Sequence, residues 1–382
     1  SDHLREHCQL TRRYFLQLGG AAAAAWSASP LAAASADVDP QLREAIARLE
    51  YLTPVARGRY GDKGNAGVRK LPTEKLREIG LVPETWSLEV VADTASSSVV
   101  ERPLTRVQGN ALDWKGLMKL AEKHAVRFLH PCFCVNGDDP FHTSVWEGVP
   151  LREIIWLAKP KANIRRVYYQ SYHQEGVAPF QASLPLGQVL ETPPGQIPVV
   201  LAYKMNGELI PAARGGPARM VLAGAYGDKS IKWVQRVVLT NDFQANDSDA
   251  ADFNADVETA MKTKARFINA PKEVSVGKPV ALTGFALVGI SGIEKVQYCV
   301  HSRGDPRPAD DPYWTKADWK DAEILQAPAD WGGGLPGGKL PANTSQIDPA
   351  TGAPIEWPMR FTLAHWAALL PGMPAGKYDL CC

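Results

Sequence analysis

Two cysteines and two histidines cluster in one short segment of the chain, at His130, Cys132, Cys134 and His142. Proline and glycine punctuate this polar segment, which predicts a loop, and an apolar run over 151–158 predicts a helix directly after it. A thiolate held on a loop beside a helix start suits soft metals and nucleophilic chemistry. One interpretation is a zinc or copper site that uses all four side chains. Against it, Cys-x-Cys is tighter than the spacer of about two to four residues that is usual in structural zinc sites.

A second segment, residues 215–233, combines glycine turns with basic residues. It joins an arginine-bearing apolar strand to a glycine turn and then to a lysine-rich loop. Arg219, Lys229 and Lys232, together with exposed backbone N–H groups, would form an anion cradle. The segment therefore predicts a binding site for a phosphate group.

Four motifs stand in the same order as in the sulfite oxidase family of molybdenum–pterin enzymes, which the chain resembles over residues 50–380. They are the turn Trp146-Glu-Gly-Val-Pro-Leu151, the segment Ala182-Ser-Leu-Pro-Leu186, the segment 202–211 and the Gly-x-Pro-x-Arg pattern that ends at Arg219. The resemblance implies a molybdenum–molybdopterin (Mo-MPT) cofactor. It also implies an α+β catalytic domain of sulfite oxidase type, followed by an all-β immunoglobulin-like sandwich that serves for dimerisation.

The resemblance also suggests which cysteine holds the metal. Cys134-Val-Asn-Gly137 is similar to the Cys-Val-Glu-Gly or Cys-Val-Glu-Ala of the family's periplasmic methionine sulfoxide reductase branch. Sulfite oxidases proper have Cys-x-x-Asn, and here Phe133 stands three residues before Asn136. Cys134 is therefore the expected sulfur ligand of molybdenum, and Cys132 a buried neighbour.

Other positions carry over individually. Ser171 falls where the reductase branch has a cofactor-contacting threonine, and Arg214 where other members have a pterin-contacting histidine or asparagine. Arg57 and Arg59 lie where family members have a substrate- or pterin-facing arginine, and they join Cys134 and Phe180 as the expected catalytic set. The expected cofactor-binding set is Ser171, Arg214, Arg219, Lys229, Ser230, Ile231 and Lys232, with residues 230–232 at the terminal phosphate.

Phe180 is the sharpest departure from the family. Sulfite oxidases proper have a tyrosine three residues before the serine of the Ala-Ser-x-Pro-Leu motif, and its hydroxyl faces the metal's oxo group. A phenyl ring cannot donate a hydrogen bond there. Either a tyrosine among residues 168–172 compensates or the chemistry differs. Arg214 adds positive charge, which favours an anionic substrate or cofactor without naming it.

The expected activity is oxygen-atom transfer coupled to a two-electron change at the metal. The resemblance favours a sulfite-dehydrogenase-like enzyme, with a sulfoxide-reductase-type molybdoenzyme as the alternative. The chain shows no haem-attachment motif, flavin fingerprint or iron–sulfur cysteine set. Electrons would then pass to an external carrier such as cytochrome c.

The N-terminus reads as an export signal. Arg12 and Arg13 form a twin-arginine signature, an apolar stretch follows, and Ala34-Ser-Ala36 is a plausible cleavage site. Twin-arginine export carries folded, cofactor-loaded proteins, so this signature predicts a periplasmic protein. Lys and Arg number 42 against 41 Asp and Glu, a balance that predicts neither a nucleic-acid nor a membrane-surface partner. Five cysteines remain after position 36, an odd number that does not predict a disulfide framework.

Residue patterns predict two domains after the signal peptide of residues 1–36. Residues 37–262 mix helices, such as 114–124, with strands at 86–91, 166–170, 198–203 and 232–239. Residues 263–382 carry strand patterns at 271–276, 278–287, 293–301, 359–363 and 376–380, with a long loop over 304–357, and they predict the sandwich. The sequence stops at a strand, so we expect a few dozen further residues or fewer in the natural protein.

Overall fold

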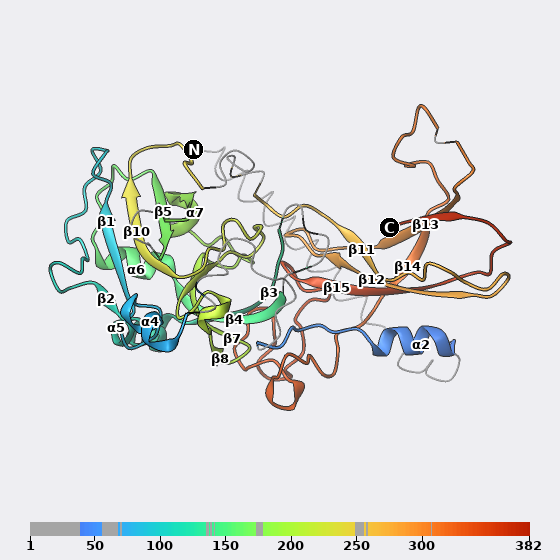
Figure 1. Ribbon diagram of the computed structural model, residues 1–382, viewed down its shortest axis with the longest axis horizontal. Helices are drawn as coiled ribbons and strands as arrows, with labels where there is room; N and C mark the ends of the chain where they lie inside the picture. Colours follow the sequence, from blue (N-terminus) through green and yellow to red (C-terminus); the bar gives the residue numbers. More distant parts are fainter. Residues whose placement is uncertain are drawn as a thin grey trace, which may run out of the picture.

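The computed structural model describes residues 39–55, 68, 71–134, 137, 140, 142–172, 179–248, 256, 259–306 and 308–382. These residues form an elongated molecule with two parts along its long axis (Figure 1). One part contains two sheets and most of the helices, and the other is built on a third sheet. The predicted signal peptide, Arg57 and Arg59 lie outside the described residues. No helix within them is long and apolar enough to cross a membrane.

The first sheet has the order β2-β1-β10-β5-β6. Its strands are β1 (Ser87–Ala92), β2 (Leu112–Asp113), β5 (Arg166–Ser171), β6 (Gln181–Pro185) and β10 (Val234–Thr240). β1 runs parallel to β10, and the other neighbours are antiparallel. Alternate side chains such as Leu88 and Val90 are fully buried in one core, each contributing roughly 1.5–3 kcal/mol. The strands predicted near 86–91, 166–170 and 232–239 are confirmed.

Helices cover this core. They are α5 (Trp114–His124), α6 (Leu151–Leu157) and α7 (Leu186–Leu190). α4 (Thr73–Glu78) packs instead through Leu76 in a smaller cluster with Leu81 and Trp233. α5 has the predicted bounds because its ends are well marked: the Asp113 carboxylate accepts a hydrogen bond from Gly116 N at 2.7 Å, and Lys123 and His124 complement the helix dipole in the last turn. In α6, Leu151, Ile154 and Ile155 form the buried face.

The second sheet has the order β3-β4-β7-β8, with β9 also pairing with β7. Its strands are β3 (Val126–Cys132), β4 (His142–Pro150), β7 (Val200–Met205), β8 (Glu208–Leu209) and β9 (Arg219–Val221). A tight turn at Asn206-Gly207, a dipeptide that favours hairpin turns, joins β7 to β8. The predicted cysteine loop is wrong in part, because His130 and Cys132 lie on β3 and His142 begins β4. Every residue of β4 is buried, so no polar–apolar alternation reveals this strand.

The third sheet has the order β11-β12-β15-β14-β13-β16. Its strands are β11 (Ala265–Asn269), β12 (Val280–Leu287), β13 (Val296–Ser302), β14 (Lys320–Ile324), β15 (Leu363–Leu370) and β16 (Tyr378–Cys381). Side chains of β12 and β15 share one core with those of β13 and β16. All six strands are joined in one hydrogen-bonded order through β14. The immunoglobulin-like sandwich therefore stays a prediction.

Three sequence predictions for this sheet are wrong. The strand predicted at 359–363 does not form there, because residues 359–362 lie in a turn and β15 begins at Leu363. Residues 271–276 form no strand, and their alternating pattern lies in an exposed turn between β11 and β12. The predicted loop 304–357 contains β14, whose central Ala322 is buried between β13 and β15. Short strands of this kind are set by tertiary pairing rather than by local propensity.

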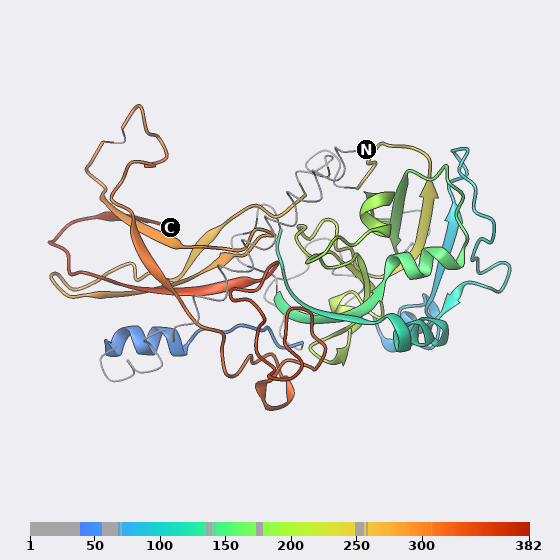
Figure 2. The ribbon, with the colours of Figure 1, turned by 180° about the vertical axis from the view of Figure 1, so that it is seen from behind.

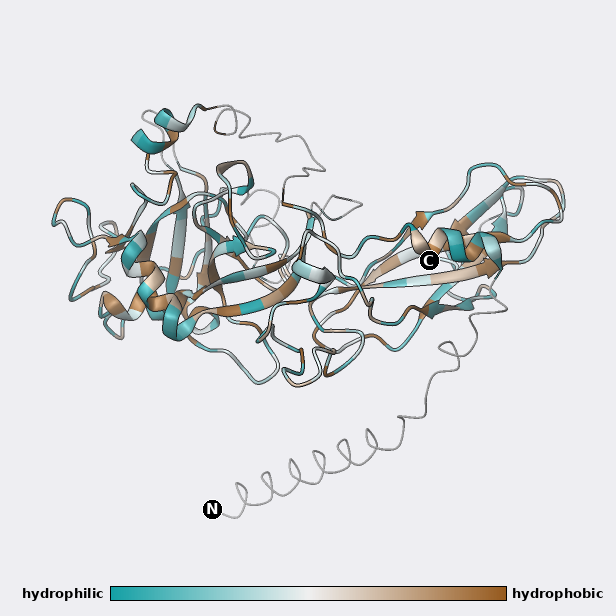
Figure 3. Cartoon of the chain, turned by 90° about the horizontal axis from the view of Figure 1, so that it is seen from below, coloured by the Kyte–Doolittle hydropathy of each residue, from teal (hydrophilic) through white to brown (hydrophobic). Residues whose placement is uncertain are grey.

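The two parts are interleaved along the chain. α2 (Pro40–Ala47) precedes the first part but packs against β12 and β15 of the second, and Ala45 is its buried residue (Figures 1 and 3). Conversely, residues 325–362 leave the third sheet and lie against the second sheet, where Trp331 and Met359 share a core with Leu129 of β3 (Figure 2). The division predicted at residue 262 therefore separates the sheets but not every segment that packs on them.

Candidate active site

The β3–β4 hairpin positions the cysteine segment. Cys132 ends β3 and lies opposite His142 across the ladder, while His130 lies opposite Ser144. Residues two apart on a strand share a face, so His130, Cys132 and His142 lie on one face of this hairpin. Cys132 is buried and Cys134, just beyond the strand, is half-buried, and neither forms a disulfide.

Phe133 anchors the segment between the two cysteines. Its ring is fully buried and packs 5.7 Å from the ring of Phe285 in β12. Its backbone oxygen accepts a hydrogen bond from Gly227 N at 2.6 Å. Lys264 donates to the backbone oxygen of Gly137 at 2.6 Å, just past Cys134. The hydrogen bond between Gly227 and Phe133 thus joins the two sequence motifs, residues 215–233 and the cysteine segment.

Glycines allow residues 215–233 to fold back on themselves. Gly215 has φ +94°, a conformation that L side chains rarely adopt, and a Cβ there would lie 2.5 Å from Lys232 Cγ. A Cβ on Gly216 would lie 1.7 Å from the Ile210 oxygen. Trp233 N donates to the Gly215 oxygen at 2.8 Å and closes the loop. Lys232 therefore approaches the turn that carries Arg214 because two glycines leave room.

Arg219 of β9 holds this loop together from inside. Its two terminal nitrogens donate to the backbone oxygens of Arg214 and Ser230, each at 2.8 Å. The guanidinium also lies 5.2 Å from the centre of the Trp146 ring, within range of a cation–π contact. The Ser230 hydroxyl accepts from Leu222 N at 3.1 Å, and the Ile231 oxygen accepts from Met220 N at 2.9 Å. Ser230 and Ile231 thus shape the loop through these contacts.

The charges of the two motifs meet at the hairpin. Burial raises the pKa of the Cys132 thiol, and Arg219 and Lys232 oppose that rise. Burial lowers the pKa of His142 well below its ordinary value, and Arg219, Arg214 and Lys232 lower it further. Three cations therefore act on one buried histidine that stays neutral, and the region attracts anions.

Several buried polar atoms in this region have no hydrogen-bond partner among the described residues. They are Arg219 Nε, His130 Nε2, His142 Nδ1 and Ser144 Oγ. Unpartnered buried donors are costly, so they indicate where a polar ligand binds. The rival zinc or copper site does not form, because His130, Cys132, Cys134 and His142 do not bring three ligand atoms within 4.8 Å of one another in the described part of the chain.

Ser171 and Phe180 lie beside this site and next to each other. Ser171 ends β5, pairs with Val234 of β10, and donates its backbone N–H to the Phe180 oxygen at 2.8 Å. The Phe180 ring packs against the core of the first sheet. Of the tyrosines that could replace its missing hydroxyl, Tyr168 donates to the Gln244 oxygen and Tyr169 to the Lys229 oxygen. Those two hydroxyls are therefore engaged by the backbone.

Lys229 does not belong to the anion cradle, which corrects the prediction. Its side chain is fully buried, and its ammonium donates to the Ser183 oxygen at 2.7 Å, Asp247 at 2.6 Å and Asp256 at 3.1 Å. All three donors of the ammonium are used inside the fold. Arg166 binds Asp256 in the same network, at 2.9 Å.

This network was missed because its members are far apart in sequence. Ser183 bridges it, accepting from Arg166 at 3.1 Å and donating to Asp247 at 2.6 Å. Ser183 belongs to the Ala-Ser-Leu-Pro-Leu motif, so that motif has a structural role here. Among the predicted cofactor-binding residues, Arg214, Arg219, Ser230, Ile231 and Lys232 come together, with Ser171 at their edge.

Comparison with known proteins agrees with this geometry. Residues 77–247 match the family described as the oxidoreductase molybdopterin binding domain. Sulfite oxidase from Gallus gallus is 33% identical over 104 residues, which cover 26% of this chain and 22% of the relative. Nitrate reductase [NADPH] from Fusarium oxysporum is 31% identical over 106 residues, which cover 28% of this chain and 11% of the relative. The chain therefore aligns with only a small part of these relatives.

A solved structure extends the likeness to the whole fold. The sulfane dehydrogenase SoxCD from Paracoccus pantotrophus matches 91% of this chain and 85% of its own, with a TM-score of 0.50 and 14% sequence identity. Residues 77–247 thus form an oxidoreductase molybdopterin binding domain. This domain is similar to part of sulfite oxidase, and its cofactor is molybdenum–molybdopterin.

The residues present fit that cofactor. Arg214, Arg219 and Lys232 supply positive charge for its phosphate, and Arg219 Nε and His142 Nδ1 supply buried polar atoms without partners. Cysteine sulfur is the soft ligand that a high-valent metal of this kind takes. When bound, the cofactor supplies two-electron redox chemistry with oxygen-atom transfer.

Proposed function

We propose that the protein is a sulfite-dehydrogenase-like enzyme that oxidises a small sulfur oxyanion and passes the electrons to a separate carrier. In that reaction, sulfite and water give sulfate, two protons and two electrons. The observation that carries the proposal is the convergence of Arg214, Arg219 and Lys232 on the cysteine hairpin. Such a cluster suits an anionic cofactor and an anionic substrate.

Within this proposal each of these residues has a separate role. Cys134 is the sulfur ligand of molybdenum, half-buried at the end of β3 where a metal could reach it. Arg219 is the internal brace that orients the phosphate-binding loop, through its bonds to the Arg214 and Ser230 oxygens. Arg214 and Lys232 provide the charge that attracts anions, and Arg57 and Arg59 are proposed to face the substrate.

The electron carrier is proposed to be a periplasmic cytochrome c, and the protein to be exported by its twin-arginine signal and to work as a homodimer. Arg12 and Arg13 support the export, and the likeness of residues 263–382 to a dimerisation domain supports the dimer. Cell fractionation with the arginine pair changed to lysine tests export. Sedimentation analysis of the full chain tests the dimer.

Steady-state assays test the reaction. Purified holoenzyme should oxidise sulfite with cytochrome c or ferricyanide as the acceptor. Methionine sulfoxide with a reduced viologen tests the alternative, a sulfoxide-reductase-type enzyme, which the loss of a tyrosine hydroxyl at Phe180 favours. Faster turnover of the sulfoxide would replace the proposal by that alternative, and turnover of neither compound would remove both substrates.

A further inference from the structure

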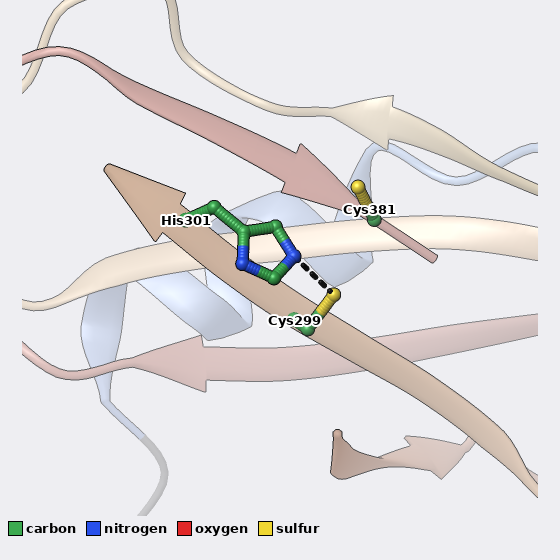
Figure 4. A group of neighbouring side chains, drawn as sticks. All are labelled: Cys299, His301 and Cys381. Carbon is green, nitrogen blue, oxygen red and sulfur yellow. Dashed lines mark hydrogen bonds between the residues drawn. The ribbon is translucent and has the colours of Figure 1, made fainter. Parts of the chain in front are cut away.

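A second group of metal-ligating side chains lies far from the molybdenum site, in the third sheet. Cys299 and His301 are on β13 and Cys381 is on β16, and one ligand atom from each lies within 4.8 Å of the others. Among the described residues, this is the one group of three or more metal-ligating side chains whose ligand atoms lie within that distance of one another. Figure 4 shows the His301 ring nitrogen directed at the Cys299 sulfur, with Cys381 on the neighbouring strand.

Strand register explains why these three meet. Cys299 pairs directly with Cys381 across the antiparallel ladder, and His301 pairs with Asp379. Residues two apart on a strand and residues directly opposite share a face, so all three side chains project from the same side of the sheet. Tyr298, Val300 and Leu380 alternate with them and face the hydrophobic core.

The group is shielded although it lies on the side away from that core. Cys299 is only 2% exposed. The Trp314 ring stacks on His301, with ring centres 3.8 Å apart and planes at 19°. This tryptophan comes from the long segment between β13 and β14, which therefore folds over the group. Stacking restrains the plane of the imidazole, and His301 Nε2 lies 3.2 Å from the Cys299 sulfur.

The spacing is close to that of a metal site. With Zn–S near 2.3 Å and Zn–N near 2.0 Å, two ligand atoms of a tetrahedral zinc ion are about 3.5–3.8 Å apart. The observed Cys299–His301 separation of 3.2 Å is slightly shorter than this value, and all three ligand atoms lie within 4.8 Å of one another. Two thiolates neutralise the charge of the ion. Asp379, opposite His301, is held by Arg303 at 2.6 Å, which leaves the fourth position to water or another donor.

We propose that Cys299, His301 and Cys381 bind a structural zinc ion that fastens β16 to β13. A disulfide between Cys299 and Cys381 is the competing chemistry, since directly opposed strand positions are close enough for one. A disulfide does not require an imidazole nitrogen beside one of its sulfur atoms, so the position of His301 favours a metal ion. The site is independent of the proposed function, because no residue of the molybdenum site contributes to it.

The test is the metal content of the full holoenzyme, purified under reducing conditions. Zinc should be present at one per chain in addition to molybdenum, and Cys299→Ser or Cys381→Ser should lower it about tenfold or more. Cys382→Ser is the matched control, because Cys382 neighbours the site in sequence but packs toward the core. It should keep its zinc. Molybdenum content should be unchanged in all three variants, which separates this site from the proposed function.

Cobalt substitution gives a measurement that needs no variant. After chelation, Co²⁺ added to the wild-type protein should give a thiolate-to-cobalt charge-transfer band and the visible bands of a tetrahedral site, and Zn²⁺ should abolish both. Three outcomes would overturn the proposal: no zinc or cobalt binding by the reduced protein, equal zinc content in Cys381→Ser and wild type, or binding of copper(I) but not zinc. A Cys299–Cys381 disulfide in protein purified without reductant, with no zinc uptake after reduction, would establish the competing chemistry.

Discussion

The two cysteines of the β3–β4 hairpin differ in what their surroundings allow. Cys132 is buried within the field of Arg219, and burial raises its thiol pKa. Cys134 lies beyond the strand and is half-buried. A metal ligand must reach a cofactor that enters from outside the strand pair, and Cys134 satisfies that condition better.

Cys134→Ser should therefore abolish turnover while much of the pterin remains bound, because Arg214, Arg219 and Lys232, the proposed phosphate-binding residues, are unchanged. Cys132→Ser, a matched change two residues away, should keep most of the activity. Turnover and released pterin are measured on both variants. An inactive Cys132→Ser together with an active Cys134→Ser would reassign the ligand.

Phe180→Tyr tests whether the pocket is built for sulfite. A hydroxyl that donates to the reacting oxygen is worth about two orders of magnitude in rate. We expect no gain in sulfite turnover, because Phe180 packs against the core and differs from the family together with Arg214, and restoring one member of a coupled pair rarely restores function. Phe180→Leu controls for packing. A rise of about tenfold or more in the tyrosine variant would show that only the hydroxyl was missing.

Lys229 has a structural role that its place in the basic loop conceals. Lys229→Met removes the partner of the buried Asp247 carboxylate and should lower the free energy of unfolding by about 3–5 kcal/mol. Denaturant unfolding measures this loss. Lys75→Met, at the exposed pair with Glu78, is the control and should leave stability unchanged. A stable Lys229→Met protein with reduced pterin content would instead return Lys229 to the anion cradle.

At the scale of elements, sequence patterns predicted what local chemistry determines. α5 carries its own capping residue and forms over the predicted residues 114–124. The Asn206-Gly207 dipeptide likewise favours the tight turn that joins β7 to β8. β3 and β4 escaped prediction because they are covered on both sides, and polar residues such as His130 and Ser144 are buried within them. β14 is short, and its place between β13 and β15 depends on contacts distant in sequence.

The candidate site also contains residues whose proximity the local sequence predicts and residues whose proximity only the fold reveals. Arg214, Arg219 and Lys232 share one glycine-rich loop, so their meeting could be predicted from the sequence. Lys229 shares that loop, but its partners Asp247 and Asp256 lie outside it, and only the fold reveals them. The cluster of Cys299, His301 and Cys381 depends on strand register, which no local pattern in this sequence specifies.

The turn at Gly215 can be tested as an element. Gly215→Ala places a Cβ 2.5 Å from Lys232 Cγ in addition to straining a positive φ, so it should displace Lys232 and lower pterin content. Gly207→Ala is the matched control, since Gly207 has φ +84° but nothing within 4 Å of a Cβ. Both variants should lose about 1–2 kcal/mol of stability from the backbone alone. Equal pterin content in the two would refute the role of the turn in placing Lys232.

At the scale of the whole molecule, segments distant in sequence hold the two parts together. The His130 ring meets the Phe361 oxygen at 3.2 Å, which joins β3 to the segment before β15. The Asn206 side chain donates to the backbone oxygens of Thr53 and Gly333, at 2.9 and 3.0 Å. His365 of β15 packs edge-on against Tyr51, with ring centres 4.2 Å apart. Buried histidines thus lie on both sides of this junction.

These histidines should make the junction sensitive to acid. Burial lowers the pKa of His365 to about 4, from an ordinary value of 6.5. Below pH 6.5 the unfolded chain therefore binds a proton that the folded chain does not, so stability falls as the pH drops from 6.5 to about 4. The difference between these two pKa values corresponds to about 3 kcal/mol in the free energy of unfolding.

His365→Phe keeps the aromatic contact with Tyr51 and removes the titrating group. Its free energy of unfolding, measured by denaturant titration at several pH values, should fall less than that of the wild type between pH 6.5 and 4, by about 3 kcal/mol. His124→Gln, a change of a half-exposed histidine in α5, should keep the wild-type pH dependence. A His365→Phe protein with the same acid slope as the wild type would show that His365 does not contribute to the acid sensitivity. His130, whose pKa burial also lowers to about 4, would then be the next residue to change.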